Sequence, residues 1–360
     1  MRFFNRCFIF IFVIMMALPL VFIDFKSDRI SVAENRMLAN RPAYSDIINN
    51  PEQFIRQFDD WFKDSTGFRE KLLALYKTVN GNKWLNNVVQ YTDGQYVYLK
   101  GEKGHHYFAY SNGFLIPKFQ GKQFLSDEQL INMASKLEMV KTYLDSKGIP
   151  LVVMFCTDKE SVYPEYYPKS IKRGPEPIQL DIITDYLKNN TSVDIFNIRQ
   201  ALLAEKDTNL LYVVASGDLT HYTQIGAFFA YRELMKHINN FFPQIIPYTT
   251  DDIEIIYDGN GNPVVTLKSG FTYIKTDSGY ENINKDLPVI LFFHDSYSAE
   301  EYIGKYFAQQ FGKAIFIHWS SISNIQEYIN LFSPDIVVFE SAERELGGFA
   351  DCVAGIPELR

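Results

Sequence analysis

Reactive side chains gather in two short stretches of the chain, each directly after an apolar segment. Residues 216–221 read SGDLTH, and residues 294–298 read HDSYS. Acyl transfer through a covalent intermediate needs a serine hydroxyl, an imidazole base and a carboxylate that orients the imidazole. Ser296, His221 and Asp218 supply these three groups. The sequence therefore predicts Ser296 as nucleophile, His221 as base and Asp218 as orienting acid.

The local spacing fits these roles. Asp218 and His221 are three residues apart, so one tight turn can place the carboxylate beside the imidazole. Ser296 is predicted at a strand-to-helix turn, where backbone N–H groups can stabilise an oxyanion. We expect the N–H groups of Ser296 and Tyr297 to be these donors. Ser298 is better placed than Ser296 to cap the helix that follows, which would leave the Ser296 hydroxyl free.

Other interpretations of the same residues stay open. Ser296 could be a helix cap, and Asp218 with His221 could be a cap and an ordinary surface histidine. Together with His294 and Asp295 they could also bind a metal ion, but the spacing typical of metal ligands is missing. We therefore expect neither a metal nor a cofactor.

The elements that must position these residues follow from apolar periodicity. Continuous apolar runs predict strands that are buried on both faces. Strands are predicted on this basis at 151–156, 193–195, 211–214, 288–293, 314–317 and 335–339, of which 193–195 contains Asp194 and 335–339 begins with Asp335. Amphipathic segments near 126–148, 178–188, 198–204, 227–238, 300–310 and 324–330 predict the helices.

Alternating strands and helices indicate an α/β fold with a mostly parallel sheet covered on both faces, that is, three layers. The polar stretch 248–284 reads as a hairpin insertion. Ligands of such sheets bind at the carboxyl ends of the strands. Both reactive stretches follow predicted strands, so we expect them to meet at one sheet edge.

Further charged residues follow other strands at the same predicted edge. Lys159 comes after the strand that ends at Cys156, and it belongs either to a solvated charge cluster or to a site that positions substrate. Glu340, Glu343 and Arg344 follow the last strand. They are expected to form an ion-pair network that fixes a loop, with substrate contact by Arg344 as the sharper alternative.

The N-terminus differs from the rest of the chain. Cys7 to Ile23 is a run of seventeen uncharged residues after Arg2 and Arg6, whereas the whole chain of 360 residues carries a formal net charge of −8. We expect a retained membrane anchor, with a cleaved signal and a buried core helix as alternatives. The large body that follows is expected outside the cytoplasm. An acidic body makes nucleic acid an unsuitable partner.

These features divide the chain into four predicted parts. Residues 1–6 form a cytoplasmic tip, 7–23 the transmembrane signal anchor, 24–86 a membrane-proximal helical segment and 87–360 the catalytic domain. In the membrane-proximal segment, Phe54, Phe58, Trp61 and Phe62 have helical spacing after Pro51. A second helix is predicted after Gly67.

Several motifs, taken in order, resemble one known family. They are AENRMLANRP, FDDWFKDSTGFREKL, DKESVYPEYYP, GDLTHYTQIGAFFAY, DSYS and SPDIVVFESAEREL. The chain resembles the alginate O-acetyltransferase AlgJ/AlgX-like family of SGNH hydrolase-like proteins, in which Asp-x-x-His precedes the serine. The resemblance implies an SGNH hydrolase-like domain with Ser296, His221 and Asp218 as its triad. Two departures are that His294 stands where glycine is common, and that separate Gly and Asn oxyanion blocks are missing.

The resemblance also implies a function. It suggests a membrane-anchored, exported enzyme that acetylates polysaccharide hydroxyl groups, usually beside a membrane-bound O-acyltransferase that delivers the acetyl group. Two alternatives remain. The same triad would make an esterase or deacetylase if water reached the acyl-enzyme first, and a non-catalytic assembly or glycan-binding component is the third.

Overall fold

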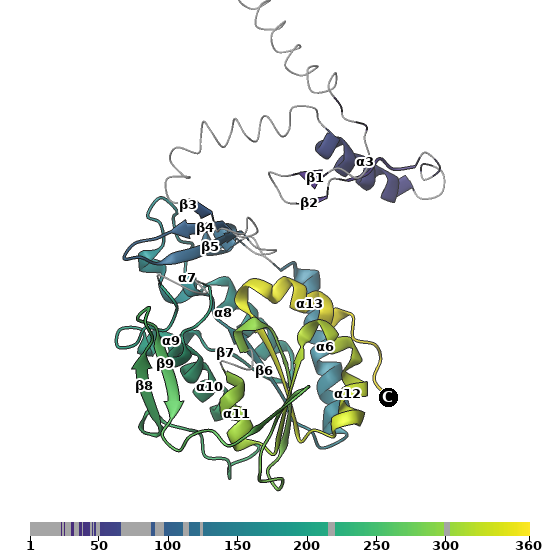
Figure 1. Ribbon diagram of the computed structural model, residues 1–360. Helices are drawn as coiled ribbons and strands as arrows, with labels where there is room; N and C mark the ends of the chain where they lie inside the picture. The colour runs from purple at the N-terminus through teal and green to yellow at the C-terminus, as the bar shows by residue number, and fades with distance from the viewer. Residues whose placement is uncertain are drawn as a thin grey trace, which may run out of the picture. The chain divides into compact units, whose positions relative to one another are not determined.

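The computed structural model describes residues 23, 25, 30–31, 36–37, 39–43, 45, 47, 51–65, 88–90, 97–110, 115–122, 125–214, 220–298 and 303–360. The chain divides into two compact units, Met1–Val88 and Val89–Arg360. They are described separately below (Figure 1).

The N-terminal unit contains one long described helix, α3 (Pro51–Ser65), where helical spacing predicts it. Its aromatic residues form a ladder, with ring centroids 6.0 Å apart for Phe54 and Phe58 and 6.1 Å apart for Phe58 and Phe62. Trp61 is buried. Two short strands, β1 (Ile30–Ser31) and β2 (Arg36–Met37), pair antiparallel.

Two predictions for this unit fall largely outside the described residues. Of the predicted anchor 7–23 only Ile23 is described, and the predicted helix after Gly67 is not described at all. Within the described ranges, none of the helices combines the length and the apolar character that crossing a membrane requires.

The second unit is built on a seven-stranded mixed sheet in the order β10-β11-β13-β12-β14-β6-β7. The central strands β13, β12, β14, β6 and β7 are parallel, and β10 and β11 add an antiparallel edge. Their bounds are β6 (Leu151–Cys156), β7 (Asp194–Asn197), β10 (Ile274–Thr276), β11 (Gly279–Glu281), β12 (Val289–His294), β13 (Lys313–His318) and β14 (Ile336–Ala342). The predicted α/β fold is confirmed, with a mixed sheet.

Helices cover both faces of the sheet (Figure 1). One core contains residues of α6, α8, α12 and α13, and the other contains residues of α9, α10 and α11. Alternate residues of β6 point to opposite cores, as the period of a strand requires. Val153 belongs to the core with α6, α8, α12 and α13, and Met154 belongs to the core with α9, α10 and α11. The bounds are α6 (Asp127–Asp145), α8 (Gln179–Asn190), α9 (Arg199–Glu205), α10 (Gln224–Ile238), α11 (Lys305–Gln310), α12 (Ile325–Phe332) and α13 (Leu346–Ala354).

Local signals account for where α6 begins. Ser126 and Gln129 form a capping box, in which the Ser126 hydroxyl accepts from the Gln129 N–H at 3.1 Å and the Gln129 amide oxygen accepts from the Ser126 N–H at 3.0 Å. This box is the one that the sequence predicts. Helix α13, by contrast, is not predicted from its glycine-rich start, because glycine is a poor helix former.

One predicted strand is wrong. Residues 211–214 do not join the sheet and form only an isolated bridge between Tyr212 and Tyr222. The segment is nevertheless buried, since the Tyr212 hydroxyl donates to the Thr157 carbonyl and the Leu211 N–H donates to the Tyr163 hydroxyl. An apolar run shows burial but does not by itself distinguish a sheet strand from a buried extended segment.

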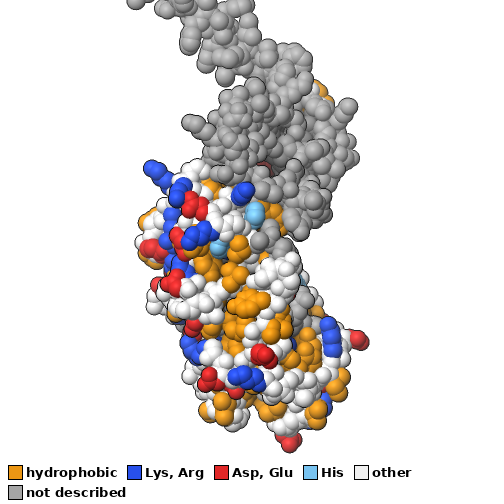
Figure 2. Space-filling model, turned by 60° about the vertical axis from the view of Figure 1, so that its left-hand side comes forward, with side chains coloured by type: hydrophobic (Ala, Val, Ile, Leu, Met, Phe, Trp, Pro, Cys, Tyr) orange, Lys and Arg blue, Asp and Glu red, His pale blue; other side chains and the backbone are white. Residues whose placement is uncertain are grey.

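Smaller elements surround the sheet. The predicted insertion contains the antiparallel hairpin β8–β9, and its later part supplies the edge strands β10 and β11. The remaining elements are α5 (Leu115–Phe119), α7 (Lys159–Val162), β8 (Ile253–Tyr257), β9 (Pro263–Leu267) and a small sheet of β3 (Val88–Gln90), β4 (Val97–Lys100) and β5 (His106–Tyr110). On the face shown in Figure 2, acidic and basic side chains are interspersed among hydrophobic ones.

Candidate active site

Ser296 stands at the carboxyl end of β12, the position that the sequence predicts. It opens a short 3-10 helix, η4 (Ser296–Ser298). Ser296 is exposed, whereas the residues on either side, Asp295 and Tyr297, are buried. The buried neighbours fix the turn, and the serine hydroxyl is left accessible at the sheet edge.

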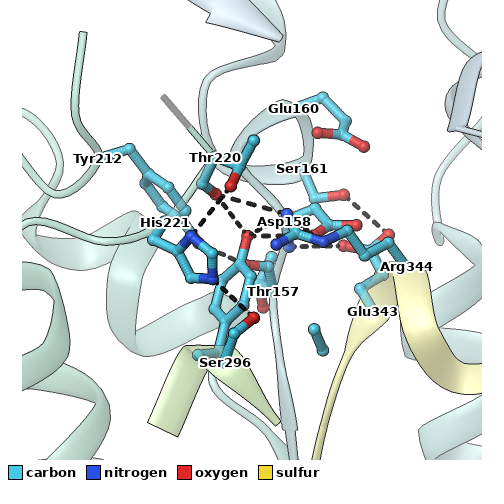
Figure 3. A network of polar contacts seen from close by, with 12 residues as sticks. Thr157, Asp158, Glu160, Ser161, Tyr212, Thr220, His221, Ser296, Glu343 and Arg344 are labelled. Atoms are coloured by element: carbon cyan, nitrogen blue, oxygen red, sulfur yellow. Dashed lines mark hydrogen bonds and ion pairs between the residues drawn. The ribbon is translucent and has the colours of Figure 1, made fainter. Parts of the chain in front are cut away.

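His221 lies beside this serine (Figure 3). Its Nε2 is 2.7 Å from Ser296 Oγ. Backbone pairing holds the histidine, because the Val213 N–H donates to the His221 carbonyl and the Thr223 N–H donates to the Leu211 carbonyl. A nucleophile and a base within hydrogen-bond distance form the reactive pair of a serine acyl-transfer site.

The other imidazole nitrogen contacts a residue that sequence reasoning missed. His221 Nδ1 is 3.0 Å from the Thr220 hydroxyl. Asp218, the predicted orienting acid, belongs to residues 215–219 and lies outside the described residues. Thr223 caps α10 by accepting from the Gly226 N–H at 3.2 Å, so it fills the cap role that was the alternative for Asp218.

Tyr297 packs beneath the pair. Its ring centroid is 4.9 Å from that of His221, and its hydroxyl donates to the Thr220 carbonyl at 2.8 Å. The Tyr297 N–H donates to Asp295 Oδ1 at 2.8 Å. This bond occupies the backbone donor that the sequence predicts for an oxyanion, so that part of the prediction is not supported. The Ser296 N–H has no hydrogen-bond partner among the described residues.

Arg344 approaches the site from the turn η7 (Glu343–Glu345), which follows β14. Its Nη1 donates to the Tyr297 hydroxyl at 3.0 Å, and its guanidinium carbon lies 4.6 Å from the centre of the Tyr297 ring. Nε and Nη2 donate to no described residue. Burial opposes the charge, but Tyr297, Asp158 and Asp295 outweigh it and raise the pKa of Arg344.

Lys159 does not belong to a solvated cluster. It is buried, and its Nζ donates to the carbonyls of His106 at 2.9 Å and Val213 at 2.6 Å. Burial lowers the pKa of Lys159 to about 7. The side chain is thus used to join β5 to the segment that leads toward residues 215–219, and direct substrate contact by Lys159 is not supported.

A buried ionic cluster lies behind Arg344 (Figure 3). Lys118 forms ion pairs with Asp158, with Glu160 at 3.2 Å and with Glu343 at 3.2 Å. Burial, opposed by Lys118, raises the pKa of Glu160 to about 7. Of the three residues expected in an ion-pair network, Glu343 pairs with Lys118 and Arg344 pairs with Asp158 at 3.5 Å. Glu340 forms no ion pair with a described residue. The central cation of the cluster, Lys118, is far away in sequence, and no pattern points to it.

Metal binding was an alternative for these residues. Among the described ranges, no group of three or more His, Cys, Asp or Glu side chains is arranged to hold a metal ion. The contacts that are described, an exposed serine hydroxyl against an imidazole nitrogen, suit acyl transfer through serine.

Three solved structures are similar to the chain at low sequence identity. A DHHW family protein from Eubacterium siraeum is 12% identical, with a TM-score of 0.50 and coverage of 76% of this chain and 99% of that chain. Bacillus cereus PatB1 is 12% identical, with a TM-score of 0.49 and coverage of 72% and 97%. The O-acetyltransferase domain of Pseudomonas putida AlgJ is 15% identical, with a TM-score of 0.46 and coverage of 72% and 99%.

Sequence comparison gives a more specific result. No curated protein sequence matches the chain significantly. The family described as "SGNH hydrolase-like domain, acetyltransferase AlgX" matches residues 118–252, a range that includes His221 and precedes Ser296. Over residues 118–252 the chain therefore matches an SGNH hydrolase-like acetyltransferase domain, which is the type of enzyme that the sequence motifs predict.

Proposed function

We propose that the protein transfers acetyl groups to hydroxyl groups of an extracytoplasmic polysaccharide through an acetyl-Ser296 intermediate. The observation that carries the proposal is the 2.7 Å contact between His221 Nε2 and the hydroxyl of exposed Ser296. The contact joins residues 75 positions apart at one edge of a parallel sheet. This edge is where α/β proteins bind their ligands.

The reaction has two halves. Ser296 Oγ attacks the acetyl carbonyl of a donor while His221 Nε2 takes the hydroxyl proton, and that proton then goes to the leaving group. In the second half, His221 takes the proton of a sugar hydroxyl as that oxygen attacks the acetyl-serine. The bond between the acetyl carbon and Ser296 Oγ then breaks, and His221 returns the proton to Ser296 Oγ. Asp218 would hold the imidazole in its productive tautomer.

Charge develops on the acetyl oxygen in both halves. The Ser296 N–H is the backbone donor that this proposal assigns to the oxyanion, in place of the Tyr297 N–H. Tyr297 contributes through its side chain, which supports both His221 and Arg344. The unpaired Nε and Nη2 of Arg344 are proposed to orient the substrate, since a guanidinium binds planar oxygen groups with two parallel hydrogen bonds.

The location and partners complete the proposal. Residues 7–23 would anchor the chain in the cell membrane, with the catalytic unit on the extracytoplasmic side. A membrane-bound O-acyltransferase would then deliver acetyl groups from the cytoplasm. This arrangement supplies an acyl donor and a growing polymer at one membrane surface.

Loss of the nucleophile tests the proposal. The Ser296→Ala protein should fold and reach its compartment, while the cells lose acetyl groups on the polymer. Incubation of wild-type protein with p-nitrophenyl acetate should give a mass increase of one acetyl group on the Ser296 peptide. Unchanged polymer acetylation in cells with Ser296→Ala would contradict the proposal.

Exposure of Ser296 also favours a second candidate, an esterase or deacetylase, because water can reach an exposed acyl-serine. Purified protein loaded with an acetyl ester separates the two functions. A transferase should consume the acyl-enzyme faster when an oligosaccharide acceptor is added and should yield acetylated sugar. An esterase should release acetate at the same rate with and without acceptor.

A further inference from the structure

Two buried carboxyl groups meet beneath the turn that carries Ser296. Asp295 is 3% exposed and Glu340 is 0% exposed. The Asp295 N–H donates to Glu340 Oε2 at 3.0 Å. Glu340 belongs to β14, which pairs with β12 so that Phe339 lies opposite Phe293. Glu340 therefore ties the first residue after β12 to the neighbouring strand.

Asp295 extends this tie across the nucleophile. Its Oδ1 accepts from the Tyr297 N–H at 2.8 Å, and its Oδ2 accepts from the Ala342 N–H at 2.7 Å. The backbone on both sides of Ser296 is thus held by the two carboxyl groups. A bond that fixes a peptide group also fixes the direction of the adjacent Cα–Cβ bond, and hence where the Ser296 hydroxyl points.

The surroundings of Glu340 oppose a charge on its side chain. Neither Glu340 nor Asp295 forms an ion pair with a described cation, and a buried carboxyl group near another one is harder to ionise. The Asp295 side chain accepts two backbone N–H groups. Burial, followed by the charge of Asp295, raises the pKa of Glu340 well above its ordinary value.

The groups that face Glu340 suit an acid that keeps its proton. Cys156 on β6 and Ser298 on η4 are its other neighbours, and burial raises the pKa of the Cys156 thiol as well. Glu340 Oε1 and Ser298 Oγ are both buried and make no hydrogen bond with a described residue. A proton on Oε1 could be donated to Ser298 Oγ.

We propose that Glu340 is a positioning residue that works as an uncharged acid, and that with the Asp295 carboxylate it directs the Ser296 hydroxyl toward His221. The inference rests on the proposed function in one respect, the assignment of Ser296 as nucleophile. An uncharged Glu340 also spares the reaction a second negative charge, which would repel the developing oxyanion.

Two substitutions separate this role from simple packing. Glu340→Gln keeps an oxygen for the Asp295 N–H and an amide that can donate to Ser298. Glu340→Met keeps an unbranched side chain but leaves the Asp295 N–H buried and unpaired. The readouts are the rate at which phenylmethylsulfonyl fluoride labels Ser296, followed by mass spectrometry, and kcat and KM for p-nitrophenyl acetate.

Glu340→Gln should label at about the wild-type rate, within roughly twofold, whereas Glu340→Met should label about tenfold or more slowly and lose kcat with little change in KM. Equal labelling of Glu340→Met and wild type would overturn the proposal. So would a Glu340→Gln protein as slow as Glu340→Met, because a neutral isostere would then have failed to replace a neutral acid.

A pH series covers the case in which Glu340→Met does not fold. Because the pKa of Glu340 is higher in the folded than in the unfolded state, protonated Glu340 contributes its full stabilisation below about pH 4.5. That stabilisation is lost as the pH rises toward the folded-state pKa. Glu340→Gln lacks this loss. The difference in thermal midpoint between Glu340→Gln and wild type should therefore shift in favour of Glu340→Gln from about pH 5 to pH 8. A difference that stays constant over this range would show that Glu340 is ionised in the folded protein.

The Ser296→Ala protein keeps the two proposals apart. If the sulfonyl label appears on another residue, the nucleophile assignment fails and the proposed function fails with it. If Ser296 is labelled in wild type but Glu340→Met labels as fast as wild type, the nucleophile stands and only the positioning role of Glu340 is overturned.

Discussion

At the scale of single residues, the imidazole of His221 has a different neighbour on each side. Nε2 meets Ser296, and Nδ1 meets the Thr220 hydroxyl at 3.0 Å. A hydroxyl can orient an imidazole but does not supply the charge that stabilises an imidazolium. The role proposed for Asp218 therefore differs in kind from that of Thr220, and substitutions should separate the two.

Asp218→Asn is expected to lower kcat for p-nitrophenyl acetate by about 10³–10⁴-fold, because an amide favours the wrong imidazole tautomer. Thr220→Val should lower kcat by no more than about tenfold, since it removes one neutral hydrogen bond. Circular dichroism of both proteins controls for folding. Similar losses in the two variants would transfer the orienting role to Thr220.

Arg344→Lys keeps the positive charge but not the planar fork on the Tyr297 ring. If the free Nε and Nη2 orient the acceptor, kcat/KM for transfer to an oligosaccharide should fall by about 10–100-fold while acceptor-free hydrolysis changes little. Arg173→Lys, at a partly exposed ion pair with Glu176, is the matched control. Parallel loss of both activities would indicate a structural role for Arg344.

The pairing of Ser296 with His221 is predicted from two strand ends at one sheet edge, but only Ser296 follows a strand of the sheet. The segment before His221 is buried beside the sheet and forms only an isolated bridge, so the predicted pair is present although half of its predicted support is not. The burial of Lys159 could not be predicted from the sequence. Its charge in the sequence DKE suggests solvent, but the first turn of α7 is covered by the small sheet and by Val213. Whether a charged side chain is buried depends on distant segments that a local pattern does not contain.

At the scale of elements, α10 must approach the 211–213 segment closely for His221 to reach Ser296. Gly226 permits this approach, because a Cβ atom there would lie 2.2 Å from the Leu211 carbonyl oxygen. The Leu211 backbone cannot move away from such an atom as the end of a flexible side chain could. The first turn of α10 is thus fixed by the absence of a side chain at one position.

Gly226→Ala should destabilise the protein by about 1–3 kcal/mol, because either α10 or the 211–213 segment has to move. Gly347→Ala is the control, since nothing lies within 4 Å of a Cβ atom at that helical position. The control should be neutral or stabilising by up to about 1 kcal/mol. Urea denaturation measures both, and equal stabilities would mean that α10 tolerates the shift.

Lys118 on α5 holds together carboxylates from two other elements, α7 and η7, as well as Asp158. Lys118→Met should destabilise the protein by about 3–5 kcal/mol, since breaking a buried ionic group leaves charges unpaired. The pKa of Glu160, already raised to about 7, would rise further. Stability held by protonated acids is lost as pH rises, so the deficit should grow from pH 5 to pH 8.

Lys236→Met is the control for this pH series, because Lys236 forms only an exposed pair with Glu233. Surface pairs of this kind contribute about 0–1 kcal/mol. A deficit of Lys118→Met that is small, or that does not change with pH, would show that the three carboxyl groups reorganise around Arg344 without their lysine.

Most elements of the central sheet could be predicted because strands such as β6 and β12 are almost entirely apolar and the helices repeat at three and four residues. The order β13-β12-β14-β6-β7 could not, since spatial neighbours such as β14 and β6 are far apart in the chain. Segment 211–214 shows the same limit. Its one tyrosine, Tyr212, is buried and donates its hydroxyl to a distant carbonyl, and in a linear pattern such burial looks the same as that of a sheet strand.

At the scale of the whole molecule, every residue assigned to the site belongs to the unit Val89–Arg360, whereas the predicted anchor belongs to Met1–Val88. Chemistry and location are therefore separable. The anchor of seventeen apolar residues would span about 26 Å as a helix, near the thickness of a hydrocarbon core. Its proposed task is to keep the acetyl donor, the enzyme and the polymer at one surface.

Removal of residues 1–23 tests this separation. The full-length protein should stay in the membrane fraction after an alkaline wash, and the shortened protein should leave it. Hydrolysis of p-nitrophenyl acetate should change by less than about threefold, because His221 and Ser296 are untouched. Acetylation of the cell's polymer should fall sharply, since the effective concentration of enzyme near its donor is lost. A shortened protein that still sediments with the membrane would place the attachment elsewhere in the chain.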